Sequence, residues 1–151
     1  MTLHFYHTSE NRGGLFTWAE LSEASGAVFP CIGIDQATTG VTHYACICIR
    51  NVNTVTAWNV GVYFSSLVQN AKVYMAKGLT GKNSVTEQTV ANVIIPPVGD
   101  FVFQTPVFEY APLALGHLGP LEFHHIWLKR VVSVNAPGEA AAYFIIKGVS
   151  G

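Results

Sequence analysis

The chain has 151 residues and a net charge of −1 at pH 7, and half of its residues are hydrophobic while only 11% are charged. This length predicts one domain that folds without disulfides or metal. The eight scattered Lys and Arg residues argue against a nucleic-acid partner. No apolar run reaches the roughly 18 residues of a membrane span, so we expect no membrane partner. A surface this poor in charge favours a subunit that is buried in an assembly.

Short runs rich in β-branched and aromatic residues follow one another along the chain, separated by Gly, Pro and Asn. This pattern predicts an all-β domain, an antiparallel β-sandwich of the Ig-like or jelly-roll kind with about eight strands. The expected strands cover residues 3–7, 41–50, 54–67, 71–75, 89–95, 101–103, 123–134 and 141–147.

The first expected strand belongs to a segment that reads as separable from the sandwich. Residues 1–14 begin apolar and aromatic and then become polar and glycine-containing, which fits an arm that reaches a neighbouring chain by main-chain pairing. We therefore divide the chain into an N-terminal arm, 1–14, and a β-sandwich domain, 15–151. Leu3, Phe5 and Tyr6 are expected to contact the partner. The alternative is an ordinary edge strand.

The next segment allows one short helix. Thr17 and Glu20 have the spacing of a capping box, and Leu15, Trp18 and Leu21 recur at helical intervals. Such a helix would cover an open end of the sandwich. The alternative is an irregular crossing with Trp18 in the core.

Three cysteines, an odd number, argue against a disulfide framework. Cys46 and Cys48 would share one face of a strand about 6.6 Å apart, which is poor geometry for a bridge and favours buried thiols. Cys31 is the one candidate nucleophile, although a packed small residue is the favoured interpretation. The sequence shows no signal-peptide pattern and no glycosylation sequon, so we expect synthesis in a cytoplasm.

The six histidines lack the short spacings of metal sites. His124 and His125 are adjacent, so a strand would point them to opposite sides. The two aspartates and seven glutamates form no recognisable acid–base pair, and no nucleophile elbow is present. We therefore expect no catalytic residue, no cofactor, no metal and no enzymatic activity.

Three parts of the chain carry motifs that can be compared with a known family. Residues 40–51 (GVTHYACICIRN), with 57–63 (AWNVGVY) after a turn, resemble a T-x-Y-R-C-hydrophobic-V-K-N strand and its successor, with Ala45 where an Arg is usual. Residues 113–142, from LALGHLGP through IWLKR to AAA, are similar to an L-x-L-G-x-L-x-x-G-x-x-x-x-I-W-hydrophobic-R-R stretch and its alanine-rich turn. Residues 86–92 (TEQTVAN) match a T-E-Q-T-hydrophobic-A-N segment. In these motifs the chain resembles tailed-phage virion structural proteins.

The resemblance implies an Ig-like or jelly-roll module, although residues 121–123 (LEF) replace the family's small-residue turn. It further implies a capsid decoration (cement) protein that is made in the host bacterial cytoplasm and binds the major capsid protein on the virion's capsid surface. Such proteins often cap threefold points of the capsid lattice, so we expect a homo-oligomer, a trimer. A neck, tail or fibre component is the alternative within the virion.

The partner-binding seam is expected in the segment that contains Phe101, Phe103 and Phe108. It is aromatic and short, and Pro106 keeps it out of the middle of a sheet. The alternative is a local flap over the domain's own core. Trp127, in contrast, is expected to be a core residue.

Two rival classes of function remain open. A carbohydrate-binding or adhesion module predicts exposed aromatic side chains, and Trp18, Trp58 and Tyr110 are the candidates. An enzyme is the third hypothesis, and none of the residues above supports it.

Overall fold

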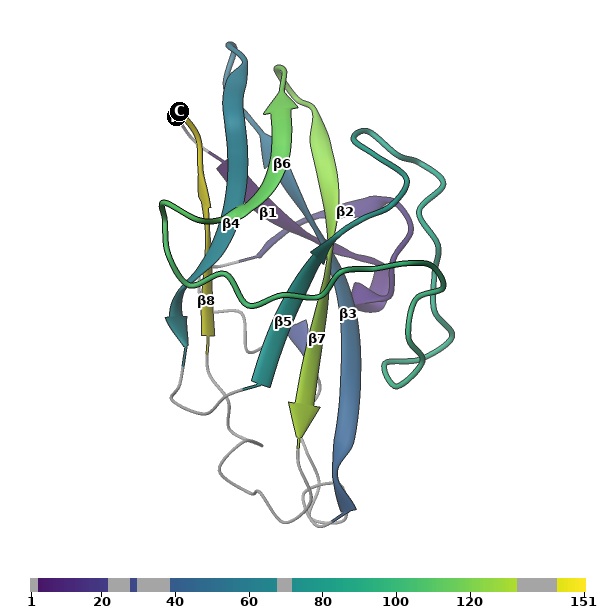
Figure 1. Cartoon of the computed structure of the whole chain (residues 1–151). Coiled ribbons are helices and arrows are strands. Elements are labelled where there is room, and N and C mark those ends of the chain that lie inside the picture. The colour runs from purple at the N-terminus through teal and green to yellow at the C-terminus, as the bar shows by residue number, and fades with distance from the viewer. Residues whose placement is uncertain (1–2, 22–27, 30–38, 68–71, 133–143) are drawn as a thin grey trace.

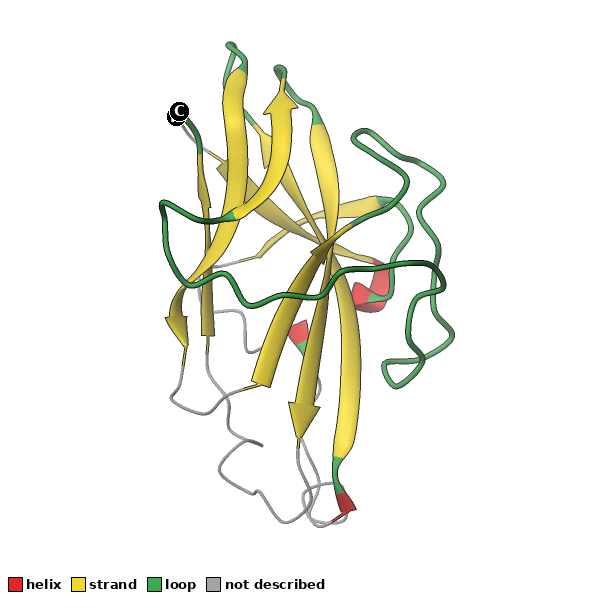
Figure 2. Ribbon diagram, viewed as in Figure 1, coloured by secondary structure: helices red, strands yellow, loops and turns green. Residues whose placement is uncertain are grey.

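The structure, a computed structural model, describes residues 3–21, 28–29, 39–67, 72–132 and 144–151 (Figure 1). These residues form eight strands and very little helix (Figure 2). The elements are β1 (Leu3–Thr8), the 3-10 helix η1 (Ser9–Asn11), β2 (Phe16–Leu21), β3 (Val41–Asn51), β4 (Ala57–Leu67), β5 (Lys72–Lys77), β6 (Leu113–Leu118), β7 (Phe123–Val132) and β8 (Phe144–Val149).

The strands form two sheets, with the orders β2-β1-β3-β7-β5 and β6-β4-β8. All of the pairs between these strands are antiparallel. The two sheets lie against one another as two layers (Figure 1), so the all-β antiparallel sandwich expected from the sequence is confirmed.

Six of the expected strands correspond to β1, β3, β4, β5, β7 and β8. The parts of them at residues 71, 133–134 and 141–143 lie outside the described residues. The other two, 89–95 and 101–103, are wrong. Both lie in the connection between β5 and β6, residues 78–112, which we call the β5–β6 loop; isolated bridges join it to the rest of the fold at Thr89 and Gln104. Its prolines, which lack an N–H, are unsuited to a central strand.

The helix expected near residue 18 is also wrong, because Phe16–Leu21 is strand β2. Strand β2 pairs with β1 in an antiparallel ladder. The Phe16 and Trp18 rings lie 5.3 Å apart, and the Trp18 ring lies 6.4 Å from that of Tyr6. Pairing and ring contacts that only the tertiary structure supplies outweigh the local capping pattern.

Strand β1 occupies an inner position, between β2 and β3. The backbone of Leu3–Thr8 therefore pairs on both sides. Leu3 and Phe5 pack against the core between the sheets. The arm expected over residues 1–14 is in this chain part of the sandwich, because its first strand completes the five-stranded sheet.

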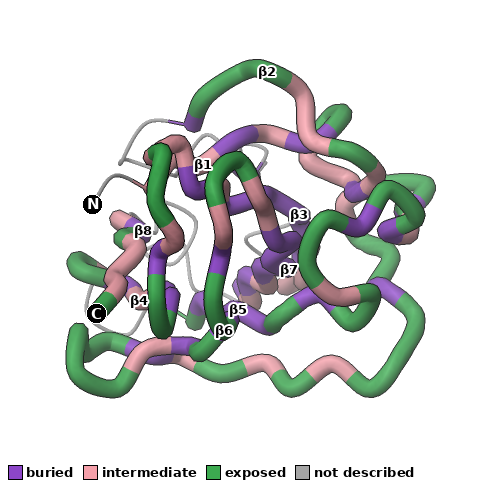
Figure 3. Tube along the Cα trace, turned by 90° about the horizontal axis from the view of Figure 1, so that it is seen from above, coloured by how far each residue is buried: buried purple, intermediate pink, exposed green. Residues whose placement is uncertain are grey.

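The main core lies between the two sheets. Strand β3 contributes Ala45, Ile47 and Ile49 to it, and β4 contributes Val62 and Phe64. Alternate side chains of each strand point into this layer, as the pleat of a sheet requires. Figure 3 shows the buried stretches of β3 and β7 inside the molecule, with mostly exposed residues along the loops around them.

A second apolar cluster, the loop core, lies on the other face of the five-stranded sheet. Its buried members are Cys46, Val90 and Trp127, and Phe101 and Phe103 pack against them. Cys46 and Trp127 come from β3 and β7, and the other three come from the β5–β6 loop. Both faces of β3 and β7 are therefore covered, which explains why consecutive residues along these two strands are buried.

Candidate functional site

The β5–β6 loop is the largest irregular segment in the described part of the chain. It leaves β5, spreads over the outer face of the five-stranded sheet and returns past β5 to the start of β6 (Figures 1 and 2). Long connections without regular structure are uncommon in compact domains, and those that persist usually serve a function. The loop is therefore the first place to look for a binding surface.

A buried hydrogen-bond network attaches the first half of the loop to the sheet. The indole N–H of Trp127, which is completely buried, donates to Oε1 of Glu87 at 2.7 Å. The hydroxyl of Thr80 donates to the other carboxylate oxygen, Oε2. Glu87 is itself buried. The network gives the carboxylate partners inside the protein, without which its burial would be costly.

Backbone hydrogen bonds hold the rest of the loop. The amide of Tyr44 donates to the carbonyl of Val93 at 2.7 Å, and Met75 and Gln104 exchange two bonds of 2.7 and 2.9 Å. The amide of Phe64 in β4 donates to the carbonyl of Pro106 at 2.8 Å. The loop is thus bound to both sheets through its own backbone, which leaves many of its side chains free to face outward.

The N-terminal segment also fastens the loop. The amide of Val90 donates to the carbonyl of Arg12 at 2.9 Å, and that of Gly14 donates to Gln88 at 3.3 Å. Gly13 between them has a φ of +111°, and a Cβ there would collide with the Gln88 carbonyl. Glycine is needed at this position because it alone tolerates both the backbone angle and the close approach.

Most of the exposed large apolar side chains in the described part of the chain belong to this loop. It carries nine of the fourteen, namely Leu79, Val85, Ile94, Ile95, Val98, Val102, Val107, Phe108 and Tyr110. The other five are Leu15, Trp18, Val55, Trp58 and Leu121. An apolar surface on a firmly attached loop is typical of a site that binds another molecule.

The structure divides the aromatic residues that we predicted as one seam. Phe101 and Phe103 have ring centroids 6.0 Å apart and pack on the loop core, so they act as the local flap that was the alternative. Phe108 is exposed, and its ring stacks on Tyr110. The outward side chains of this segment are therefore Val102, Val107 and Phe108.

The three predicted partner residues of β1 lie elsewhere in the molecule. Leu3 and Phe5 are half-buried against the main core, and Tyr6 is buried under Phe16 and Trp18. The structure does not bring them together with the Phe101–Phe108 segment. Their surroundings within this chain account for their apolar character.

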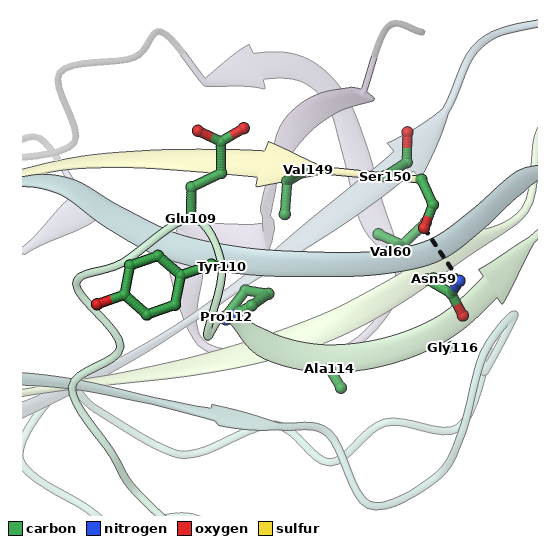
Figure 4. Close-up of a pocket in the computed structure, with 10 residues that line it drawn as sticks. Asn59, Val60, Glu109, Tyr110, Pro112, Ala114, Gly116, Val149 and Ser150 are labelled. Atoms are coloured by element: carbon green, nitrogen blue, oxygen red, sulfur yellow. Dashed lines mark hydrogen bonds between the residues drawn. The ribbon is translucent and has the colours of Figure 1, made fainter.

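A hollow of about 380 Å³ opens on the outer face of the three-stranded sheet, next to the end of the β5–β6 loop (Figure 4). Ala114 and Gly116 of β6 line it, together with Asn59 of β4, Tyr110 of the loop and Ser150 after β8. Tyr110 and the nearby Trp58 are exposed, as is Trp18 on the other sheet. The carbohydrate-binding alternative required such exposed aromatic side chains, and the alternative that placed Trp18 in the core is wrong.

Among the described residues, those considered for catalysis or metal binding have surroundings that do not favour these roles. Burial raises the pKa of the Cys46 thiol, with smaller contributions from Cys48 and Glu87, and burial also raises that of Cys48. Buried thiols with raised pKa values are poor nucleophiles. Cys31 lies outside the described residues. Within the described ranges, no group of three or more His, Cys, Asp or Glu side chains could hold a metal ion.

Two residues with large structural roles were not singled out from the sequence. Glu87 was seen only as part of a motif. Asn51, at the end of β3, donates through its side chain to the carbonyls of Val55 and Leu118, both at 2.8 Å. It thereby joins the β3–β4 turn to the end of β6. Both residues belong to the segments that resemble the virion family, so these motifs serve the fold.

Comparisons with protein-family models, with curated proteins and with solved structures found no match to this chain. In the described ranges, no helix is long and apolar enough to cross a membrane. The link to virion proteins therefore rests on the resemblance of residues 40–51, 86–92 and 113–142, and the function is a matter for proposal.

Proposed function

We propose that this chain is a non-enzymatic virion structural protein of a tailed phage, a capsid decoration (cement) protein that binds the major capsid protein lattice. The virion origin rests on the resemblance described above. The observation that supports a binding role is the β5–β6 loop, whose backbone is tied to both sheets while nine large apolar side chains face outward.

The attachment of the loop favours tight binding. A surface that is already ordered loses little conformational entropy when a partner docks, so more of the interaction energy appears as affinity. The exposed part of the loop also carries few charges, and the centre of protein interfaces is depleted of charged residues. A cement protein gains from both properties, because it must remain bound to a lattice.

The copy number in purified particles tests the location. Quantitative mass spectrometry should find the protein in a simple fixed ratio to the major capsid protein. Only a few copies per particle would contradict decoration of the capsid and favour the neck, tail or fibre alternative. Absence from particles would contradict the virion proposal as a whole.

Substitution of exposed loop residues tests the binding surface. Val85 and Val98 are 70% and 83% exposed, so Val85→Asp and Val98→Asp should leave the fold intact and weaken co-sedimentation with particles that lack the protein. We expect at least a tenfold loss, because a charge buried without a partner in an interface is costly. The matched control is Val55→Asp, at an exposed valine outside the loop. Equal binding by all three variants would contradict the loop as the docking surface.

We also propose that the bound protein is a trimer, with Val102, Val107 and Phe108 as the outward residues of its seam. A stable seam buries about 800 Å² on each partner. Light scattering gives the mass of the free protein, and particle imaging gives the symmetry of the bound form. Phe108→Ser should dissociate the oligomer without lowering the melting temperature. A single copy bound to each capsid subunit would overturn this part of the proposal.

A further inference from the structure

The hollow on the outer face of the three-stranded sheet is lined by Glu109, Tyr110 and Pro112 from the end of the β5–β6 loop, and not by Val85 or Val98 (Figure 4). We propose that it is a binding site for a neutral oligosaccharide. This inference does not depend on the capsid role, and it would give a virion protein a second partner.

Small residues create the hollow. Ala114 and Gly116 line it from β6, and a Cβ at Gly116 would meet nothing within 4 Å. Beside them Pro112 lies so close to Gly61 of β4 that a Cβ at Gly61 would collide with the proline ring. The end of the loop therefore rests directly on the sheet, and it places Tyr110 at the rim.

Tyr110 offers a rigid aromatic platform. The residue is 83% exposed, and its ring lies nearly parallel to that of Phe108, with centroids 5.0 Å apart and an angle of 13°. One face of the tyrosine is thus supported by Phe108 while the ring stays open to solvent. A flat ring with a polar tip suits a ligand that combines an apolar face with hydroxyl groups, which is the chemistry of a sugar ring.

A second aromatic platform lies further along β4. Trp58 is 58% exposed and makes an edge contact with His117 at 4.5 Å. The next residue, Asn59, has a φ of +47°, and its amide donates to Nδ1 of His117 at 3.1 Å. Trp58 directly precedes Asn59, which lines the hollow. A second exposed ring beside a lining residue favours a chain of sugars over a single ring.

The polar groups of the hollow fit hydroxyl groups. The side-chain amide of Asn59 donates to the carbonyl of Gly151 at 3.0 Å, which positions the residue and leaves its Oδ1 as an acceptor. Within the described part of the chain, the side chains of Glu109 and Ser150 make no hydrogen bond. Pockets for small ligands commonly combine an apolar lining with a few such polar groups.

The charge of the hollow sets the class of sugar. Glu109 is acidic, and no Lys or Arg is among the residues that line the hollow. Phosphorylated, sulfated or uronic sugars would bring a second negative charge beside this carboxylate without a compensating cation. The site therefore favours neutral oligosaccharides.

A glycan array with neutral and acidic oligosaccharides, followed by NMR titration of the full chain with the bound glycans, tests the proposal. We expect binding to neutral glycans, with shifts at Tyr110, Ala114 and Asn59. Tyr110→Ala removes a platform, and Ala114→Leu fills the hollow from an exposed position; each should weaken binding at least tenfold. Trp18→Ala, which removes an exposed tryptophan from the other sheet, is the matched control and should bind like the parent.

The proposal would be overturned if no neutral glycan bound at millimolar concentration or if acidic glycans bound better than neutral ones. It would also be overturned if Trp18→Ala weakened glycan binding as much as Tyr110→Ala and Ala114→Leu do. If the parent protein bound no glycan, and Tyr110→Ala and Ala114→Leu lost binding to particles, the hollow would be a site for a protein partner. That result would also overturn the glycan proposal. Val85→Asp and Val98→Asp leave the hollow intact. A failure of the capsid proposal can therefore be distinguished from a failure of the glycan site.

Discussion

The two cores of this domain are built in different ways. The main core is a layer between two sheets, filled by alternate side chains of strands such as β3 and β4. The loop core lies on the opposite face of the same five-stranded sheet, where a loop supplies Val90, Phe101 and Phe103 to cover Cys46 and Trp127. The first is a product of strand periodicity. The second exists only because a distant segment folds back over the sheet.

The difference shows how a binding surface can be added to a sandwich. An outer sheet face is normally polar, and here it is apolar because the β5–β6 loop covers it. The loop in turn presents its own apolar side chains one layer further out. The loop core therefore links the stability of the domain to the shape of its proposed docking surface, whereas the main core serves stability alone. Four experiments break or sharpen this distinction.

Deletion of residues 1–14 should have the largest effect, because it damages both cores. It removes β1 from between β2 and β3, and it removes the carbonyl of Arg12 that holds Val90. We expect the truncated protein to lose cooperative thermal melting, measured by circular dichroism. A truncated protein that melts cooperatively would restore the separable arm expected from the sequence.

Trp127→Ala should destabilise the domain by about 3–5 kcal/mol, the range for large aromatic truncations in cores. Phe64→Ala in the main core is the comparison, and denaturant midpoints give both values. Amide hydrogen exchange then distinguishes the two cores. At denaturant concentrations below the global unfolding transition, Trp127→Ala should speed amide exchange along the β5–β6 loop, and Phe64→Ala should not. Equal loop exchange in the two variants would contradict the independence of the loop core.

Trp127→Phe should cost less, about 1–3 kcal/mol, because most of the buried ring remains while the donor to Glu87 is lost. The denaturant midpoint measures this cost. Glu87→Gln in the same background is the control, since it replaces a buried carboxylate that has lost one of its two donors and should recover part of the stability. No recovery would mean that packing, and not the hydrogen bond, attaches this part of the loop.

Mild acid should destabilise the domain at the edge of the main core, with no effect at neutral pH. Burial, together with the nearby Arg130, lowers the pKa of His43 from 6.5 to about 4, and Arg130 donates to its Nδ1 at 2.9 Å. The unfolded chain then binds more protons between these two values, so stability is constant above pH 6.5 and falls as the pH drops toward 4. Denaturant midpoints across this range measure the fall.

The control for the acid effect is His43→Asn, which keeps an acceptor near Arg130 but does not titrate. It should flatten the pH dependence without abolishing it, because burial also lowers the pKa of His125, on the loop-core face of β7, and of His124, on the opposite face. An unchanged pH dependence in His43→Asn would assign the acid sensitivity to His124 and His125.

Local pattern determined the parts of this fold that depend on local geometry. The alternating or continuous apolar runs predicted β3, β4 and β7, and the burial of Cys46, Cys48 and Trp127 followed from them. The class of the fold could be predicted for the same reason, since strand periodicity is a property of neighbouring residues.

Only the tertiary structure decided which segments pair and which sheet face is covered. Residues 16–21 fit a helix or a strand until β1 lies beside them. Phe103 and Phe108 are five residues apart in similar surroundings, yet one covers the loop core and the other is exposed. Glu87 could not be recognised as a buried acceptor before Trp127 was placed next to it. Each of these outcomes depends on contacts between residues far apart in the chain, and a local pattern does not contain them.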